Sequence, residues 1–312
     1  MSATTHIQWC DATFNPWIGC TKVSPGCAHC YAELSTPTRV LRADGRETWG
    51  RGAARQRTSA ATWKSPLRWA RQARPNLAGE HPQFPPRPRV FCASLADWLD
   101  DEVPIQWLSD LLALIRVCRE LDWLLLTKRP QFWRERMEAV ATLGDIGGQI
   151  AAEWLAGRPL PNIWNGTTVE DQARADIRCA DFREIPARVH FVSYEPALEQ
   201  VDWAGWEFIA WLIMGGESGA QARSCQVEWF WASLFWCRGA GVAPFVKQLG
   251  GAVFTQNANA LAWPDDTFFA ECGEQTAAGA RVMLSQKKGG DLAEWPEELC
   301  VREFPKGAEP TA

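Results

Sequence analysis

The sequence predicts an α/β fold, a partial (β/α) barrel with a mixed C-terminal cap. Short segments that are apolar throughout, such as Trp123–Leu126, alternate with longer segments whose apolar residues recur at helical spacing. That alternation is typical of a parallel sheet covered on both faces. Counting from Phe14 gives about seven strand candidates, too many crossovers for two small domains. We expect a barrel-like domain over residues 1–250 and an extension over residues 251–312 that packs on it.

The composition is that of an ordinary globular protein, with 46% hydrophobic and 22% charged residues among 312. No apolar run is long enough to cross a membrane, and the polar start Met1–His6 lacks the order of a signal peptide. We therefore expect a cytoplasmic protein with no membrane partner, whose 11 cysteines are free or metal-bound. Most of the 19 tryptophans are expected to pack in the core and at its rim.

The expected elements follow in a regular order. Residues 31–88 form a basic insertion, helical with breaks as far as Arg74 and ending in the proline-rich loop His81–Pro88. Beyond it, strands and helices are predicted to alternate. The strands are Arg89–Ala93, Trp123–Leu126, Ile163–Gly166, Val189–Val192, Phe208–Met214 and Pro244–Gln248, and the helices begin near Pro104, Gln131, Ile150, Ala173 and Val227. The tail from Gly250 is less periodic and is expected to form the cap.

Polar or charged residues follow nearly every predicted strand. One polar strand end carries no information, because strands must exit to water. A series of them, all after strands of one parallel sheet, favours a site, since active sites of parallel α/β barrels are built at that edge. The pairs are Ser94 and Asp97, Thr127 and Lys128, Thr168 and Glu170, Ser193 and Glu195, and Glu217 and Ser218.

Three cysteines, Cys20, Cys27 and Cys30, lie within one short loop. The intervening Pro25-Gly26 demands a turn, which brings the three thiols back toward one another. Three converging thiolates suit a [4Fe-4S] cluster that keeps one iron open to a further ligand. They suit zinc less well, because no second ligand pair follows. The alternative is ordinary core packing, since free cysteines are often buried.

A second local feature is the basic segment Arg39–Arg89. It holds twelve basic residues against Asp44, Glu47 and Glu80, although the chain as a whole has a net charge of −5. Three tryptophans are interleaved with the basic residues. Two interpretations stay open: the segment binds a nucleic-acid phosphate backbone, or it is a solvated arginine-rich surface.

The order of these motifs resembles the phage Gp37/Gp68 family, also called the three-Cys-motif family. That family is similar to a divergent branch of the radical S-adenosylmethionine (SAM) enzymes, which have a partial (β/α) barrel. The resemblance covers nearly the whole chain. The segments that carry it are Trp17–Cys27, Cys30–Glu33, Ser94–Asp97, Leu126–Pro130, Tyr194–Pro196, Gly215–Gly219, Lys247–Gly251 and Val301–Pro305.

The resemblance implies that Cys20, Cys27 and Cys30 hold three irons of a [4Fe-4S] cluster and that SAM chelates the fourth. It implies cleavage of SAM to a 5′-deoxyadenosyl radical, with an electron from a donor such as flavodoxin or ferredoxin. The commonest radical SAM motif is C-x3-C-x2-C, with an aromatic residue before the last cysteine. This chain departs from it, with six residues in the first interval and His29 before Cys30.

By position, further residues are expected to bind SAM. Ser94 and Asp97 suit its ammonium group, and the paired glycines allow a backbone to approach a ligand closely. Lys128 and Arg129 suit a carboxylate or phosphate. The full expected set is Ser94, Asp97, Thr127, Lys128, Glu170, Ser193, Glu195, Gly215, Gly216 and Glu217. The sequence singles out no catalytic residue beyond these.

The function that the resemblance implies is modification of a nucleobase, or of an amino-acid adduct of a base, during hypermodification of phage DNA. A specific hypothesis is an isomerase acting on a glycyl-thymine. If the protein is phage-encoded, its compartment is the host cytoplasm. The alternative is a non-catalytic iron–sulfur or zinc protein that binds nucleic acid or a partner protein.

Overall fold

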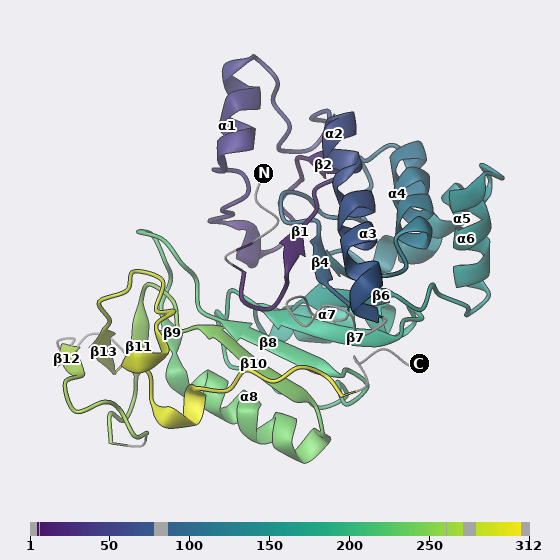
Figure 1. The fold of residues 1–312 in the computed structure, drawn as a ribbon. Helices are drawn as coiled ribbons and strands as arrows, with labels where there is room; N and C mark the ends of the chain where they lie inside the picture. Colours follow the sequence, from purple (N-terminus) through teal and green to yellow (C-terminus); the bar gives the residue numbers. More distant parts are fainter. Residues whose placement is uncertain (1–4, 6, 78–86, 260, 271–278, 307–312) are drawn as a thin grey trace. The chain divides into compact units, whose positions relative to one another are not determined.

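The computed structural model describes residues 5, 7–77, 87–259, 261–270 and 279–306. Most of the proline-rich loop predicted at His81–Pro88 lies outside these residues, as does Cys272. Helices and strands alternate along much of the chain (Figure 1).

Seven strands form one sheet in the order β1-β4-β5-β6-β7-β8-β10. The pairs β1–β4, β4–β5, β5–β6, β7–β8 and β8–β10 are parallel. This is the strand order of a partial (β/α) barrel, so the predicted fold class is confirmed at that level. The strands are β1 (Ala12–Thr13), β4 (Arg89–Cys92), β5 (Asp122–Thr127), β6 (Ile163–Thr168), β7 (Val189–Tyr194), β8 (Trp211–Gly215) and β10 (Ala243–Gln248).

From β4 onward helices separate consecutive strands of this sheet, as predicted, except between β7 and β8, where no helix was expected. The α-helices are α1 (Thr36–Ala43), α2 (Ala60–Trp63), α3 (Ser65–Leu77), α4 (Ile105–Val117), α5 (Trp133–Ala141), α6 (Ile146–Leu155), α7 (Gln172–Arg183) and α8 (Val227–Ala240). Short 3-10 turns cover Pro25–Cys27, Pro130–Phe132, Leu292–Glu294 and Glu297–Leu299.

The remaining described strands form two smaller sheets. β2 (Trp17–Ile18) pairs antiparallel with β3 (Gln56–Arg57), so the insertion predicted as helical also contains a strand. The other sheet has the order β12-β13-β11-β9. Its strands are β9 (Cys225–Gln226), β11 (Val253–Thr255), β12 (Phe268–Ala270) and β13 (Ala280–Met283). Because β9 precedes residue 250, this sheet draws on both predicted domains.

Two predicted boundaries are wrong for local reasons. The helix expected near Ile150 begins at Ile146, because the Asp145 side chain accepts a hydrogen bond from Gly148 N at 2.8 Å and caps the helix earlier. The strand expected from Phe208 begins at Trp211, because a turn still holds the chain at Ile209, whose N donates to Trp206 O at 3.0 Å.

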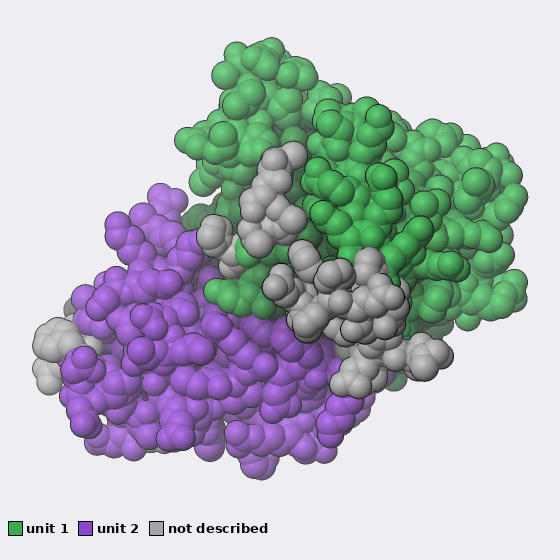
Figure 2. Space-filling model, viewed as in Figure 1, with its two compact units in different colours: residues 1–167, 180–190, 307–312 green, residues 168–179, 191–306 purple. Residues whose placement is uncertain are grey.

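The chain divides into two compact units, one of residues 1–167, 180–190 and 307–312 and the other of residues 168–179 and 191–306 (Figure 2). The division runs through the segment predicted as a barrel. The domain boundary predicted at residue 250 therefore stays a prediction.

Tryptophans dominate the core of the first unit. The rings of Trp98 and Trp154 stack at 5.7 Å with an interplanar angle of 2°, and Trp133 meets Trp154 edge-on at 5.8 Å. Trp154 Nε1 donates to Pro186 O at 2.6 Å, so its polar atom is satisfied. Many of the tryptophans are buried as predicted; they are Trp9, Trp17, Trp98, Trp123, Trp133, Trp154, Trp164, Trp203, Trp206, Trp211 and Trp295.

The core of the second unit forms where α8 packs on β10 and β11. Tyr194 lies edge-on to Trp203 at 5.4 Å and to Phe230 of α8 at 6.2 Å. α8 ends at Gly241, whose φ of 72° is the left-handed conformation that terminates helices. Among the described residues, no helix combines the length and the apolar character that a membrane span requires.

Two helical glycines predict opposite changes in stability. A Cβ at Gly147 of α6 would lie 2.2 Å from Ser109 O of α4, so Gly147→Ala is expected to lower the free energy of unfolding by about 1–3 kcal/mol. A Cβ at Gly239 of α8 meets nothing within 4 Å. Gly239→Ala is expected to raise that free energy by about 0.5–1 kcal/mol, because alanine favours helix. Urea denaturation of both variants checks this, and equal stability of the two would contradict it.

Candidate metal and cofactor centre

The three cysteines lie on the loop that follows β2. A 3-10 turn over Pro25–Cys27 reverses the chain, with Cys27 N donating to Ser24 O at 3.0 Å and Ala28 N donating to Pro25 O at 3.1 Å. All three thiols are half-buried, and none is in a disulfide. The turn predicted from Pro25-Gly26 is confirmed.

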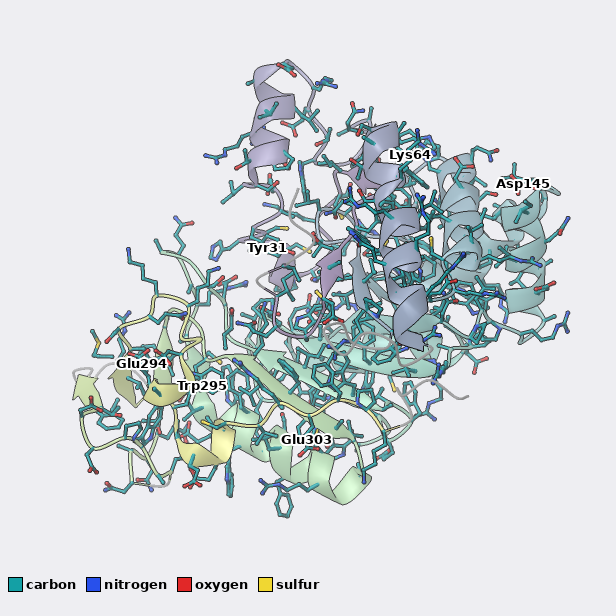
Figure 3. The ribbon with its side chains drawn as sticks, in the orientation of Figure 1. Tyr31, Lys64, Asp145, Glu294, Trp295 and Glu303 are labelled. Carbon is teal, nitrogen blue, oxygen red and sulfur yellow. The ribbon has the colours of Figure 1, made fainter. Side chains whose placement is uncertain are left out.

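Backbone hydrogen bonds fix both ends of this loop. Gly19 N donates to Leu95 O at 3.1 Å, and Gly50 N donates to Cys20 O at 3.0 Å. At the far end the hydroxyl of Tyr31, which is labelled in Figure 3, donates to Ser94 O at 3.0 Å. The cysteine loop is therefore attached to the segment that follows β4, where the sequence predicts cofactor ligands.

Arg129 connects the loop to the end of β5. Its side chain is buried, and Nη1 donates to Cys20 Sγ at 3.4 Å and to Asp97 Oδ2 at 2.9 Å. Nη2 donates to Thr21 O at 2.6 Å. Burial disfavours the charge, but Asp97 and Cys20 outweigh it and raise the pKa of the guanidinium, so Arg129 stays protonated. From the sequence, Arg129 was expected to contact a carboxylate or phosphate of a ligand. In the structure it donates hydrogen bonds to the cysteine loop.

Asp97 organises the turn after β5. Its Oδ1 accepts from Thr127 Oγ1 at 2.7 Å and from Leu99 N at 3.0 Å, and its Oδ2 accepts from Lys128 N at 2.8 Å as well as from Arg129. A carboxylate has about four acceptor positions. Contact between Asp97 and the SAM ammonium, as predicted, would therefore require one of these bonds to be given up.

A second arginine holds the loop from the other side. Arg55 is buried and donates to Thr21 Oγ1 at 2.8 Å, to Asp100 Oδ2 at 2.7 Å and to Glu102. Thr21, the residue after Cys20, thus accepts from Arg55 at its hydroxyl and from Arg129 at its carbonyl. The two arginines fix the backbone beside the first cysteine.

The thiols differ in acidity. Burial raises the pKa of Cys20 to about 12, and Arg129 only partly offsets it. Burial also acts on Cys27, but there the Lys128 charge and hydrogen bonds from Val23 and Ser24 prevail and lower the pKa below 9.0. Cys27 is therefore the thiol more readily converted to the thiolate that binds metal.

The donor set fits a thiolate-held cluster in type and charge. Three thiols on one loop, beside the cationic Lys128 and Arg129, suit an anionic iron–sulfur group. In the described parts of the chain, no group of three or more His, Cys, Asp or Glu side chains lies close enough together to hold a metal ion. Ligation therefore requires the loop to close around the metal.

Polar residues at the strand ends of the second unit form three ion pairs. Buried Glu170 pairs with Arg178, and Glu195 pairs with Lys247 of β10. Glu217 accepts from Arg223 Nε at 2.9 Å, from Nη2 at 2.6 Å and from the backbone N at 2.9 Å. Sequence reasoning selected the three carboxylates but not Arg178, Lys247 or Arg223. Ser193, also predicted as a ligand, is buried at the end of β7, where its carbonyl accepts from Val169 N at 3.0 Å.

The two predicted glycines have different roles. A Cβ at Gly216 would lie 2.1 Å from Leu249 O, so its missing side chain accommodates the protein's own backbone. Gly216 N also donates to Gln248 O at 3.1 Å. A Cβ at Gly215 would lie 3.3 Å from Glu195 Cδ, in tight contact with that predicted site residue. At Gly216 the predicted close approach is therefore that of Leu249 O, and not that of a ligand.

Among the residues of the first unit, the predicted set is brought together well. Thr127, Lys128 and Asp97 contact one another directly. Ser94 has a different partner: its Oγ accepts a hydrogen bond from the side-chain amide of Asn15 at 3.0 Å. Sequence reasoning assigned no site role to Asn15 or to Arg55, because their partners become clear only in the folded chain.

A family model described as a protein of unknown function, DUF5131, matches residues 4–292 of the 312. The chain belongs to the DUF5131 family. No curated protein and no solved structure matches it. The family description states no activity, so the resemblance of this DUF5131 protein to the phage Gp37/Gp68 family stays a prediction.

The acidity difference between the thiols predicts their reactivity in the metal-free DUF5131 protein. At neutral pH, iodoacetamide is expected to modify Cys27 faster than Cys20, because only the thiolate reacts. Lys128→Gln is expected to slow modification of Cys27. Lys22→Gln serves as the matched control, because the ammonium of Lys22 pairs with Glu33. Mass spectrometry of the modified peptides measures both rates. Faster modification of Cys20 would contradict the assignment.

The buried pair predicts a strong, non-additive effect on stability. Arg129→Met leaves Asp97 buried without its cation and is expected to lower the free energy of unfolding by about 3–5 kcal/mol. Adding Asp97→Asn removes the stranded charge and is expected to restore part of the loss. Urea denaturation of the two single variants and the double variant measures these changes. Lys128→Met, at a half-buried lysine, serves as the control. A double variant that loses the full sum of the single losses would refute the pairing.

Proposed function

We propose that this DUF5131 protein is a radical SAM enzyme. The observation that carries the proposal is the cysteine loop. Three free thiols lie on one loop, and Arg129, which follows β5 of the parallel sheet, donates to Cys20. Active sites of parallel α/β barrels lie at the carboxyl ends of their strands. Together, a reduced [4Fe-4S] cluster and SAM supply abstraction of hydrogen from an unactivated carbon.

The residues that would hold the cluster are Cys20, Cys27 and Cys30. Lys128 favours the thiolate of Cys27, and Arg129 donates to the sulfur of Cys20. Both contacts stabilise negative charge on sulfur, and the thiolate is the form of cysteine that binds metal. Arg55 and Arg129 position the loop through Thr21.

The strand-end ion pairs support SAM as the ligand. The methionine end of SAM carries an ammonium and a carboxylate. A ligand with both charges can exchange with a pair such as Glu195–Lys247 or Glu217–Arg223 and leave neither member of the pair without an opposite charge. A ligand with one charge would strand one member of the pair.

For the substrate, we propose a nucleobase or an amino-acid adduct of a base in phage DNA, such as a glycyl-thymine that is isomerised. The support is the similarity to a phage family and the basic segment Arg39–Arg89, in which Lys64, Arg68 and Arg71 pair with no carboxylate of the described residues. The electron would come from a flavodoxin- or ferredoxin-type donor.

Anaerobic reconstitution with iron and sulfide tests the proposal. The protein is expected to bind iron, to absorb visible light and, with dithionite and SAM, to release 5′-deoxyadenosine. Cys27→Ala is expected to abolish iron binding and SAM cleavage, whereas Cys300→Ala, which removes an exposed thiol far along the chain, is expected to preserve both.

Three outcomes separate the proposal from its alternatives. An intact cluster without 5′-deoxyadenosine would identify a non-catalytic iron–sulfur protein. Zinc in place of iron after anaerobic purification would identify a zinc protein. Loss of the cluster in Cys300→Ala but not in Cys27→Ala would show that the wrong loop has been assigned.

A further inference from the structure

Most basic side chains of the segment Arg39–Arg89 are paired with carboxylates, some within the segment and others elsewhere in the chain. Seven of its twelve basic side chains pair with carboxylates at 4 Å or less. The pairs are Arg42–Glu47, Arg46–Asp44, Arg55–Asp100, Arg57–Asp110, Arg74–Glu120, Arg87–Asp122 and Arg89–Asp11. Arg57 also lies 4.1 Å over the ring of Trp63. In each of these pairs the carboxylate offsets the charge of the arginine.

Three of the remaining cations gather on one helical face. Lys64, Arg68 and Arg71 are exposed, and within the described parts of the chain no carboxylate pairs with any of them. Their spacing of four and three residues places them on the same side of a helix. α2 and α3 are nearly continuous there, since Lys64 N donates to Ala60 O at 3.1 Å and Arg68 N donates to Lys64 O at 3.3 Å.

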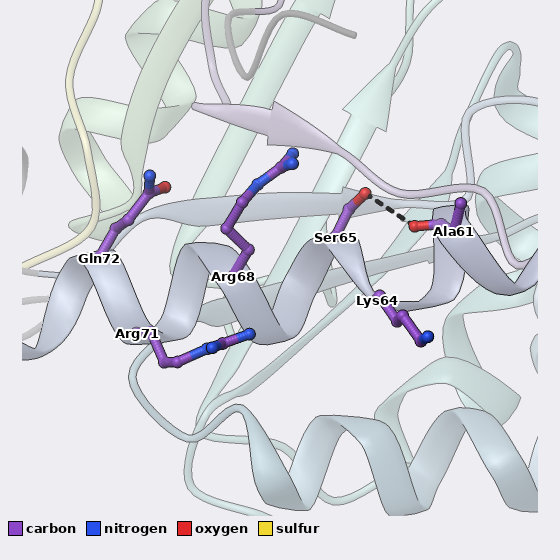
Figure 4. A pocket seen from close by; sticks show the side chains of 6 residues that line it. All are labelled: Ala61, Lys64, Ser65, Arg68, Arg71 and Gln72. Carbon is purple, nitrogen blue, oxygen red and sulfur yellow. Dashed lines mark hydrogen bonds between the residues drawn. The ribbon is translucent and has the colours of Figure 1, made fainter.

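These cations line an open hollow of about 450 Å³ (Figure 4). Its other lining residues are Ala61, Ser65 and Gln72, so the hollow adds hydroxyl and amide groups to the three charges. None of the residues predicted to bind the cluster or SAM lines it. The hollow is therefore a separate surface, which we call the α2–α3 basic face (Lys64, Ser65, Arg68, Arg71 and Gln72).

The chemistry of the α2–α3 basic face matches phosphodiesters. Cations, a hydroxyl and an amide are the groups that contact nucleic-acid phosphates. From Lys64 to Arg71 the helix rises about 10 Å, the axial length of about three nucleotides of one strand of duplex DNA. No aromatic side chain lines the hollow, whereas surfaces for unpaired strands combine cations with aromatic stacking platforms.

We propose that the α2–α3 basic face binds the phosphate backbone of duplex DNA, independently of base sequence. The inference does not depend on the proposed radical SAM activity, because it uses no residue of the cysteine loop or the strand ends. It also resolves the two interpretations of the basic segment: most of its arginines are structural, and one helical face is left to bind phosphates.

Fluorescence anisotropy with a labelled duplex of about 20 base pairs tests the proposal across a range of salt concentrations. Contacts with about three phosphates predict that the logarithm of the association constant falls against the logarithm of salt with a slope near −3. The triple variant Lys64→Gln, Arg68→Gln, Arg71→Gln is expected to bring the slope close to zero, and each single variant to reduce it by about 1. Duplexes of different sequence are expected to bind equally.

A matched control removes the same charge elsewhere. Arg116, Arg158 and Arg238 are exposed, and the triple variant with glutamine at all three is expected to bind DNA with the native slope. Circular dichroism confirms that both triple variants are folded. An equal loss of binding in the two variants would show a response to net charge alone and would overturn the proposal. So would tighter binding of a single strand than of the duplex, or native-like binding by the Lys64, Arg68, Arg71 variant.

Discussion

The candidate centre depends on one buried ion pair, Arg129 with Asp97. An arginine at 1% exposure is unfavourable unless a carboxylate and further acceptors compensate its charge. Asp97 supplies the carboxylate, and Thr21 O and Cys20 Sγ supply the other acceptors. Because Asp97 also accepts from the turn after β5, a single pair fixes the cysteine loop and that strand end together.

This arrangement separates two roles that the sequence cannot distinguish. Polar residues at strand ends can be ligands or supports, and both kinds occupy the same positions. Asp97 has its acceptor positions filled by the protein, which makes it a support in this conformation. Lys128 lies in the same turn and lowers the pKa of Cys27, so its charge acts on the thiol that metal would bind.

Local patterns allowed much of the fold to be predicted. The strands Trp123–Leu126 and Val189–Val192 and the helix opened by Pro104 follow from apolar periodicity within a few residues. What could not be predicted is the choice of partner. Arg55 meets Asp100 across 45 positions, and Gly216 is required by Leu249 O, a contact that exists only after β8 and β10 pair. Periodicity contains no information about such contacts.

The same limit explains why the charge of the basic segment is misleading when counted along the sequence. Several of its acidic partners come from elsewhere in the chain: Asp110 belongs to α4, Asp122 to β5 and Asp11 precedes β1. The pairs of Arg57 with Asp110 and of Arg87 with Asp122 attach the insertion to α4 and to the parallel sheet. The field that a ligand meets is set by cations without such partners. On α2 and α3 the cations Lys64, Arg68 and Arg71 recur at helical spacing. These three residues form a basic surface, although they are a small part of the formal charge of the segment.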